Sequence, residues 1–454
     1  MSFRTDLVRT DLVRSDPVPD TPVPDDTVST DPVRSGPVRA GRTGDAQEGG
    51  ADPVRPGPDH ADSGGADAAG HVRGGRPDPA RPDRAGRGPA GHGHADRDPY
   101  FDNAKFLAVV LVVIGHAWEP LRGANIGGRL LEAAQTFIYA FHLPAFIVMC
   151  GYFSRGFPTT RGRTRKLVAA IVVPYVLFSV AYPLWAGLLS GDHVGWDPLE
   201  PYYLTWFLPA LLLWRLSTPL WQQIRLPVVV AVLISMLAGF VTLPSMLNAA
   251  QVLSFLPFFV LGLVLRPHHF AILHRRAVRV AGAAVLLLGG LTAYLLALSV
   301  DPEWVHWRRS FGQLGVGASA GVGFRIVAMA AALVLTVAFL AVVPARRTWF
   351  TRLGSATMYA YLLHGFVTLY LSYQDWYYGI SGEQVLLVTV GCALLAVVLS
   401  GEPARRAFRW AVEPRLDWLF RTDPARRPQS RRRSGRRENT RGRRDTAGMV
   451  TGTE

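Results

Sequence analysis

The apolar residues of this 454-residue chain are gathered into long blocks, and they are not spread at the spacing of a water-soluble core. Most blocks run for about 18 to 23 residues, close to the roughly 20 residues that a helix needs to cross the ~30 Å hydrocarbon layer of a bilayer. Ten blocks occur, at residues 105–121, 130–153, 167–189, 203–221, 226–243, 249–265, 280–300, 322–344, 353–373 and 384–401. The pattern predicts an all-α fold, a polytopic transmembrane helical bundle of about ten spans.

The connections between these blocks differ in charge, and this difference predicts their orientation. An even number of spans places both termini on one side of the membrane. The even-numbered connections, 155–166, 222–227, 266–279 and 345–352, hold 13 Lys or Arg, whereas the odd-numbered ones hold 4. Because basic loops stay on the cytoplasmic side, both termini are expected there, in a multi-pass protein of the cell membrane.

The formal net charge of +14 does not require a nucleic-acid partner. Residues 402–454 contain 15 Arg against 7 acidic residues, and such a run beside a span is typical of an orientation signal and a contact with anionic lipids. No folded module with stacking aromatic residues accompanies it, so no nucleic acid is expected. Cys150 and Cys392 both lie inside apolar blocks, and we therefore expect neither a disulfide framework nor a metal site.

Composition divides the chain into three parts. Residues 1–99 hold 13 Arg and 17 acidic residues with almost no aromatic residues, so they cannot bury enough surface to offset their chain entropy. We expect a disordered N-terminal tail there, either dispensable or a partner-binding arm. Residues 100–421 are expected to form one integral membrane domain, and residues 422–454 an Arg-rich disordered tail.

The first block carries ionisable residues on one helix face. Residues 102–119 read DNAKFLAVVLVVIGHAWE. The eleven steps from Lys105 to His116 make three helical turns plus about 20°, so the two side chains share a face about 16 Å apart along the axis. Glu119 follows His116 by three residues and joins the same face. One stripe is thus expected to carry a cation at the cytoplasmic boundary and an imidazole in the outer part of the membrane.

Each of these residues also has a plainer interpretation. A lysine at a helix end is typical of an anchor at the membrane interface, although only 2 of the 48 basic residues in this chain are lysine, which weakens that interpretation for Lys105. A buried histidine can simply bond a neighbouring carbonyl. Because an ionisable group inside a span costs several kcal/mol, a functional role for His116 is the working hypothesis.

Three further residues are candidates for substrate binding. His142 precedes Pro144 in FHLPAF, and that proline releases backbone carbonyls that can line a polar cavity. Trp206 lies in YLTWFLP, and His364 lies in LGSATMYAYLLHGF behind Gly354, which permits a close helix approach. The alternatives are core histidines bonded to carbonyls and an interfacial aromatic belt.

Histidines at similar depths fit two chemistries. One is general-base activation of an acceptor hydroxyl by His116, with Glu119 orienting the ring or raising its basicity. The other is a proton relay in a transporter of a small polar solute, although no repeat of broken helices relates the two halves of the sequence. A structural or signalling protein whose N-terminal tail recruits partners is a third hypothesis. Composition and spacing do not separate these.

Four segments, in this order, resemble the acyltransferase-3 family of integral membrane O-acyltransferases, and particularly its fucose 4-O-acetylase-like branch. They are DNAKFLAVVLVVIGHA, FHLPAFIVMCGYFSRG followed by RTRK, YLTWFLPALLLW and LGSATMYAYLLHG. The resemblance covers about residues 97–405. It implies an enzyme with no bound cofactor that takes an acyl group, most often acetyl, from cytoplasmic acyl-CoA and delivers it to a hydroxyl of a sugar, glycolipid or secondary metabolite.

The resemblance also implies roles for individual residues. The family's basic residue before the characteristic histidine corresponds to Lys105, and that histidine to His116. Arginine is commoner at the first position, so Lys105 would act as a point charge near the donor. Cys150 stands where relatives often have serine, which favours packing over a hydroxyl role.

The remaining expectations concern the two substrates. The phosphates of CoA would meet a basic cluster that also serves as a topology signal, made of Arg161, Arg163, Arg165 and Lys166. A sugar would meet external residues that otherwise belong to the interface, namely Trp196, Trp304, Trp307, Arg308 and Arg309.

Overall fold

The computed structural model describes residues 98–156 and 167–415, and every regular element in these ranges is helical. Each of the ten predicted blocks contains a helix. These are α2 (Pro99–Gly123), α3 (Gly128–Ser154), α5 (Val173–Ser190, preceded by the π-helix Val168–Val172), α6 (Phe207–Trp221), α7 (Pro227–Ala238), α8 (Ala249–Val264), α10 (Arg276–Leu296), α12 (Ala318–Val342), α13 (Thr357–Tyr373) and α14 (Gly382–Leu399). The short helices α9 (Pro267–Leu273), α11 (Glu303–His306) and α15 (Glu402–Val412) lie between or after them.

Within the described ranges, seven helices are long and apolar enough to cross a membrane. The predicted all-α, multi-pass architecture is therefore confirmed, whereas ten spans and cytoplasmic termini stay predictions. The three blocks outside the seven are those of α6, α7 and α13. Two of these begin with a tighter 3-10 turn, Tyr203–Trp206 before α6 and Leu353–Ala356 before α13, so that the continuous α-helix is shorter than its apolar block.

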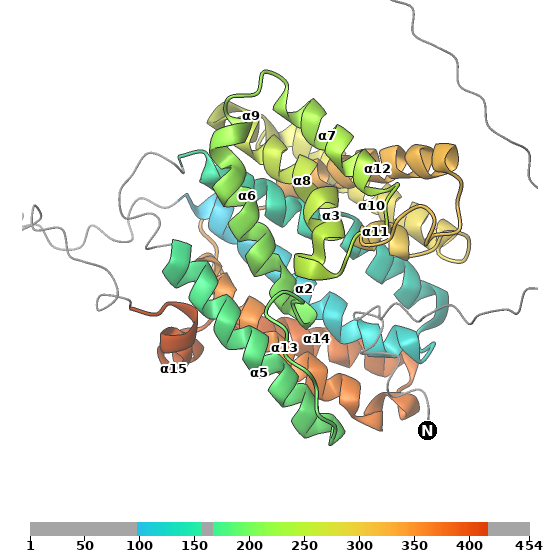
Figure 1. The fold of residues 1–454 in the computed structure, drawn as a ribbon, viewed down its shortest axis with the longest axis vertical. Helices are drawn as coiled ribbons and strands as arrows, with labels where there is room; N and C mark the ends of the chain where they lie inside the picture. Colours follow the sequence, from blue (N-terminus) through green and yellow to red (C-terminus); the bar gives the residue numbers. More distant parts are fainter. Residues whose placement is uncertain (1–97, 157–166, 416–454) are drawn as a thin grey trace, which may run out of the picture. The chain divides into compact units, whose positions relative to one another are not determined.

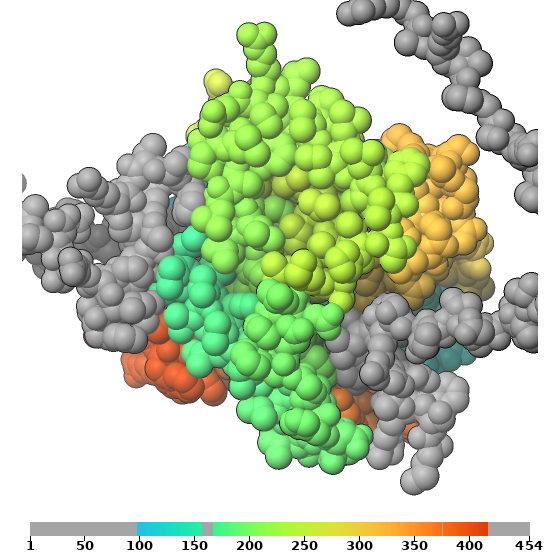
Figure 2. Space-filling model, in the orientation of Figure 1, coloured from blue at the N-terminus to red at the C-terminus, as the bar shows by residue number. Residues whose placement is uncertain are grey.

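Helices α2 and α3 lie side by side and each supports its own group of neighbours (Figure 1). Helix α2 packs against α13 and α14, and α13 continues the layer to α5. Helix α3 packs against α8, α10 and α12, with α7 against α8. In the same orientation, α5 to α7 cover much of the face toward the viewer (Figure 2). The two groups meet along α2 and α3, and this meeting line contains the site described below.

The start of α2 is fixed to the segment that follows α12 by one buried amide. Asn103 is fully buried, and its Nδ2 donates to the carbonyls of Pro344 (2.7 Å) and Arg346 (2.9 Å). Its Oδ1 accepts from the hydroxyls of Thr348 (3.1 Å) and Thr351 (2.7 Å). All hydrogen-bonding positions of this amide are thereby occupied by protein groups, as a buried polar side chain requires.

A glycine next to this anchor allows the backbones to touch. A Cβ at Gly354 would collide with the carbonyl oxygen of Asp102, so only glycine permits the 3-10 turn before α13 to lie directly on α2. The close helix approach expected at Gly354 is therefore confirmed. It places α13, with His364, against the middle of α2.

The predicted tails lie almost entirely outside the described residues, as do all four members of the basic cluster at 161–166. Helix α2 begins at Pro99, with Asp98 as its N-cap accepting a hydrogen bond from the backbone of Tyr100 (3.0 Å). The predicted domain start at residue 100 thus falls within one residue of the first helix.

Candidate active site

A cavity of about 380 Å³ lies between α2, α3, the turn before α6, α8, α13 and the loop that contains α11. Its wall has a polar part and an aromatic part. One part is polar, with side chains from α2, α3 and the α11 loop, namely His116, Glu119, Arg122, Tyr139, His142, His306 and Arg308. The other part is largely aromatic and includes Tyr202, Trp206, Phe207, Phe255 and Tyr361. A cavity with a few convergent polar groups in an apolar surround is typical of a small-molecule site.

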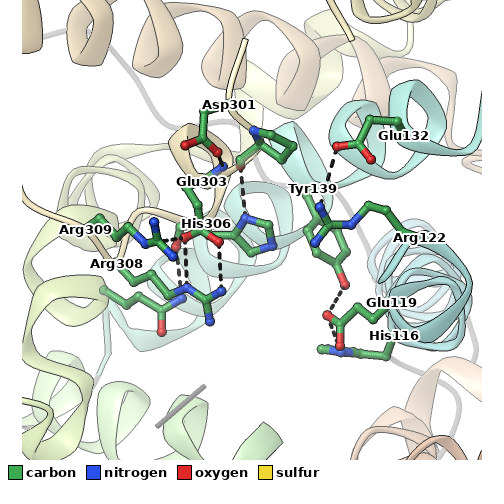
Figure 3. Close-up of polar contacts among 12 residues, drawn as sticks. His116, Glu119, Arg122, Glu132, Tyr139, Asp301, Glu303, His306, Arg308 and Arg309 are labelled. Atoms are coloured by element: carbon green, nitrogen blue, oxygen red, sulfur yellow. Dashed lines mark hydrogen bonds and ion pairs between the residues drawn. The ribbon is translucent and has the colours of Figure 1, made fainter. Parts of the chain in front are cut away.

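His116 belongs to the polar wall and lies at one end of a series of contacts that runs to Glu119 and Tyr139 (Figure 3). Its Nδ1 lies 3.1 Å from Oε1 of Glu119, one helical turn further along α2. The same carboxylate oxygen accepts a hydrogen bond of 2.8 Å from the hydroxyl of Tyr139 on α3. The i, i+3 spacing on α2 brings the imidazole and carboxylate together, and the contact between α2 and α3 supplies the phenol. Glu119 is therefore held between a ring nitrogen and a hydroxyl group.

The residue before His116 makes room for this phenol. A Cβ at Gly115 would lie 2.5 Å from Cε1 of Tyr139, inside the contact distance of real side chains. The carbonyl of Gly115 also accepts a hydrogen bond from Nε2 of the buried Gln135 (3.2 Å). Glycine at position 115 thus allows the Tyr139 ring to lie against the backbone of α2, next to the His116–Glu119 pair.

Two more histidines line the cavity around Tyr139. The rings of His142 and His306 each have their centroid 5.1 Å from that of Tyr139. His142 Nδ1 bonds the carbonyl of Ile138 (2.8 Å), and His306 Nδ1 bonds the carbonyl of Pro302 (3.0 Å). Because a carbonyl only accepts, both Nδ1 atoms carry the hydrogen, and in the neutral rings Nε2 is the remaining acceptor.

His364 is placed differently from the prediction that it binds substrate directly. It is fully buried and does not belong to the residues lining the cavity. Its ring lies behind His116, with centroids 5.6 Å apart, and its Nδ1 bonds the carbonyl of Ala360 (2.8 Å). The buried Nε2 has no hydrogen-bond partner among the residues that the structure describes. The position supports the His116 ring instead of forming the cavity wall.

Trp206, which was predicted to bind substrate, lines the cavity. It is half-buried and stacks on Phe255 of α8, with ring centroids 6.2 Å apart and an interplanar angle of 22°. The neighbouring Tyr203 has a positive φ of 55°, uncommon for a residue other than glycine. Its hydroxyl lies 2.9 Å from that of Thr368. The turn before α6 therefore directs two aromatic side chains towards the cavity.

An ion-pair cluster holds the α11 loop at the cavity (Figure 3). Glu303 binds Arg308 through both carboxylate oxygens, at 3.1 and 3.0 Å, and contacts Arg309 at 3.3 Å. Burial alone would raise the pKa of Glu303, but the hydrogen bond and charge of Arg308 lower it to about 2. Gln251 of α8 adds a hydrogen bond to the carbonyl of His306 (3.0 Å). The loop is thereby fixed with His306 and Arg308 at the cavity wall.

A family model described as an acyltransferase domain, that of the acyltransferase-3 family, matches residues 98–401. This match spans two thirds of the chain and all ten predicted blocks. The protein belongs to the acyltransferase-3 family. No significant match was found among curated proteins or among solved structures. The expected family is confirmed, and a membrane acyltransferase is the activity that it supports, while the fucose 4-O-acetylase-like branch stays a prediction.

In this acyltransferase, Lys105 does not reach the cavity. Its Nζ forms an ion pair with Oδ1 of Asp102 at 2.6 Å and lies 5.7 Å from the centroid of the Phe153 ring. The expected cation at this end of α2 is thus ion-paired with Asp102, and its role near the donor stays a prediction. The i, i+3 spacing of the two residues in DNAK is the signal that would have predicted this pair.

Among the five external residues proposed to meet a sugar, only Arg308 lines the cavity. Trp307 is buried against Phe255 and Phe258, with ring centroids 5.8 and 6.2 Å away. Trp304 packs on Phe324, with centroids 5.1 Å apart. These two tryptophans serve to pack the loop onto α8 and α12.

Sequence reasoning missed Tyr139 and His306. Tyr139 precedes His142 by three residues, so the helical spacing did carry a signal that both lie on one face of α3. His306 carried none, because its place depends on how the loop after residue 300 folds over α3 and α8. Residues contributed by loops are positioned by tertiary contacts that no local pattern encodes.

Proposed function

We propose that this acyltransferase transfers an acyl group, most simply acetyl, from acyl-CoA to a hydroxyl group of a sugar, glycolipid or secondary metabolite, with His116 as general base. The observation that carries the proposal is the His116–Glu119–Tyr139 array in the wall of a cavity large enough for a small acceptor. A histidine held by a carboxylate is a common arrangement for proton abstraction near neutral pH.

The chemistry follows from the contacts of the ring. With Nδ1 of His116 facing Glu119, Nε2 is the atom that takes the proton from the acceptor hydroxyl. The alcohol oxygen attacks the thioester carbonyl, the carbon–sulfur bond breaks, and the proton passes from the imidazolium to the departing CoA thiolate. Glu119 stabilises the transient imidazolium, and Tyr139 fixes the carboxylate by its hydrogen bond. No net proton is gained or lost.

The donor is proposed to enter from the end of α2 that carries Lys105. Lys105 places an ammonium group there, ion-paired with Asp102. The predicted basic cluster of Arg161, Arg163, Arg165 and Lys166 belongs to the connection after α3, at the same predicted cytoplasmic end. CoA phosphates favour such surroundings. The thioester would then extend along α2 to His116, about 16 Å away by the helical rise.

The acceptor is proposed to occupy the cavity between the aromatic and polar walls. Trp206 offers a flat apolar surface of the kind on which a sugar ring packs. His142 offers Nε2 as an acceptor for a second hydroxyl, since its Nδ1 is engaged by Ile138. His364 is proposed to act only through the His116 ring that it supports.

The test is the loss of an acyl increment in cells. Mass spectrometry of surface glycans, lipids and metabolites should show a species in cells with the wild-type protein that disappears in a deletion strain and in His116→Gln. The matched control is His268→Gln, an exposed histidine on α9 outside the cavity, which should restore the species. An unchanged product in His116→Gln would refute the general-base proposal.

The second candidate function is a proton-coupled transporter of a small polar solute. It is favoured by the ring arrangement alone. His116, His142 and His306 line the cavity and His364 lies against His116, so that the four rings resemble a relay. Proton uptake into proteoliposomes driven by solute in the absence of acyl-CoA would support it. Acyl transfer that depends on His116 would argue against it.

A further inference from the structure

Helix α2 brings three functional side chains to the cavity on successive turns of one face. Glu119 lies beside His116, and Arg122 also lines the cavity three residues further on. Arg122 is six residues beyond His116 and one residue before the end of α2 at Gly123, so it lies roughly 9 Å further along the helix axis. Arg308 of the α11 loop lines the same cavity. We call the part lined by Arg122 and Arg308 the cavity mouth, and the part at His116 and Glu119 the cavity floor.

Arg308 belongs to an ion-pair cluster on the α11 loop. Glu303 is the carboxylate that both Arg308 and Arg309 contact, so one negative charge faces two guanidinium groups. Glu303 remains ionised at neutral pH, because its pKa is about 2 despite burial. His306, next to them, stays neutral there, because burial and the charge of Arg308 lower its pKa. Arg308 is the guanidinium group of this cluster that lines the cavity.

The second arginine of the mouth is held less completely. Nη1 of Arg122 lies 3.5 Å from Glu132, a long ion-pair distance, and the side chain of Arg122 is one-third exposed (33%). Its Nε is buried without a hydrogen-bond partner in the part of the chain that the structure describes. A buried guanidinium donor without an acceptor is costly, and a ligand oxygen would relieve that cost.

We propose that the acceptor carries an anionic group, a carboxylate or a phosphate, which Arg308 and Arg122 bind at the cavity mouth while the hydroxyl to be acylated lies at His116. The proposal rests on the function proposed above and narrows its substrate class. Guanidinium groups match the planar oxygen pairs of carboxylates and phosphates.

The opposite charges of mouth and floor would also orient such an acceptor. An anionic group is attracted by Arg308 and Arg122 and repelled by the carboxylate of Glu119. The anionic end is therefore kept at the mouth, and a hydroxyl several bonds away is presented to His116. A neutral acceptor has no such preference, and it would leave the two guanidinium groups of the mouth without an anionic partner from the ligand.

The test uses cells that contain the full chain, and it identifies the product before it uses variants. Lipids, glycans and metabolites that gain an acyl increment in wild-type cells, compared with the deletion strain, are isolated and their charge is determined. We expect every such species to carry a carboxylate or a phosphate. Methyl esterification identifies a carboxylate, and phosphatase treatment or release of inorganic phosphate identifies a phosphate. A neutral acylated product would overturn the proposal, whereas no acyl increment at all would refute the proposed function itself.

Two matched variants then locate the anion. Arg308→Gln removes the guanidinium that lines the cavity, and Arg309→Gln removes the one that shares Glu303 without lining it. Loss of a charge-assisted contact with the acceptor should lower the acylated product about tenfold or more in Arg308→Gln. We expect Arg309→Gln to stay within about twofold of the wild type. Equal levels in both variants would overturn the role of Arg308, and the charge of the wild-type product decides the proposal even if Arg308→Gln fails to insert.

Discussion

Both ends of helix α2 carry polar residues, but only those at one end face a cavity. At the first end, the Asn103 amide has four hydrogen bonds to protein groups, and Lys105 is paired with Asp102. At the other end, His116 and Glu119 pair with each other but also face a cavity. At both ends, polar groups in an apolar environment have hydrogen-bond or ion-pair partners, as burial requires.

The difference shows how a structural polar residue can be separated from a chemical one in a membrane helix. Asn103 has no hydrogen-bonding position left for a ligand, because protein groups occupy all of them. His116 has one ring nitrogen at Glu119, and the residue itself lines the cavity. An intramembrane polar residue is thus a functional candidate when its contacts leave it accessible from a cavity, and not simply because it is polar.

The largest effect is expected from weakening the support of His116. Glu119→Gln keeps the size and the hydrogen bond with Tyr139 but removes the charge that stabilises the imidazolium. Acyl transfer should fall about 100-fold, within the usual range for general-base catalysis. The measurement is the rate of product formation in membranes with equal amounts of protein. Glu383→Gln, at the exposed start of α14, is the control. A rate for Glu119→Gln within twofold of that control would contradict the assigned role.

Asn103→Ala tests the opposite end and should affect stability instead. The carbonyls of Pro344 and Arg346 would lose their donor, and the hydroxyls of Thr348 and Thr351 their acceptor. Each buried group left without a partner costs about 1–3 kcal/mol, so the melting temperature in detergent should fall clearly. The rate per folded molecule should remain near that of the wild type. Normal stability with lost activity would reverse the comparison.

A smaller effect is expected at Lys105, which lies outside the cavity and is already paired. Lys105→Met should raise the KM for acyl-CoA severalfold with little change in kcat, because the contribution of a half-exposed point charge is modest. Lys105→Arg should retain the wild-type KM. A large loss of kcat in Lys105→Met would mean that the charge acts on the reacting atoms, and the two ends of α2 would then not be separable.

The smallest effect is expected from pH acting on the α11 loop. Burial and the charge of Arg308 lower the pKa of His306 in the folded protein. As the pH falls, His306 therefore binds a proton in the unfolded protein before it does so in the folded one. The free energy of unfolding should decline as the pH falls below about 6.5. Glu303 also makes the folded protein less stable at lower pH. Its contribution to stability is lost as the pH falls from its ordinary pKa of 4.5 to its pKa of about 2 in the folded protein. Thermal melting between pH 7.5 and about 5 should show a shallower decline in His306→Gln. Identical slopes would contradict this assignment.

Much of the fold could be predicted from sequence, because the bilayer restricts helices to apolar blocks of characteristic length. The ten blocks, the shared face of His116 and Glu119, and the close approach at Gly354 all follow from spacing and residue type. The shortened α6 and α13 did not, since an apolar composition does not distinguish an α-helix from the 3-10 turns that precede them.

The site was predictable only where its residues share one helix. The pairing of His116 with Glu119 is a local i, i+3 relation, whereas the contact of Tyr139 with Glu119 joins residues twenty positions apart, and that of His306 with Tyr139 depends on a distant loop. His364 shows the opposite error. Its depth near His116 was anticipated, but the direction of its side chain, away from the cavity, is decided by how α13 packs against α2.

The most direct test of the central claim measures transfer of a radiolabelled acetyl group from acetyl-CoA by purified protein in proteoliposomes. Membranes from a deletion strain serve as the source of acceptor. We predict acceptor-dependent labelling by the wild type, a rate at least ~100-fold lower in His116→Gln with an unchanged melting temperature, and near wild-type labelling in His268→Gln. Labelling by His116→Gln at the wild-type rate would contradict the claim that the cavity end of α2 performs the chemistry.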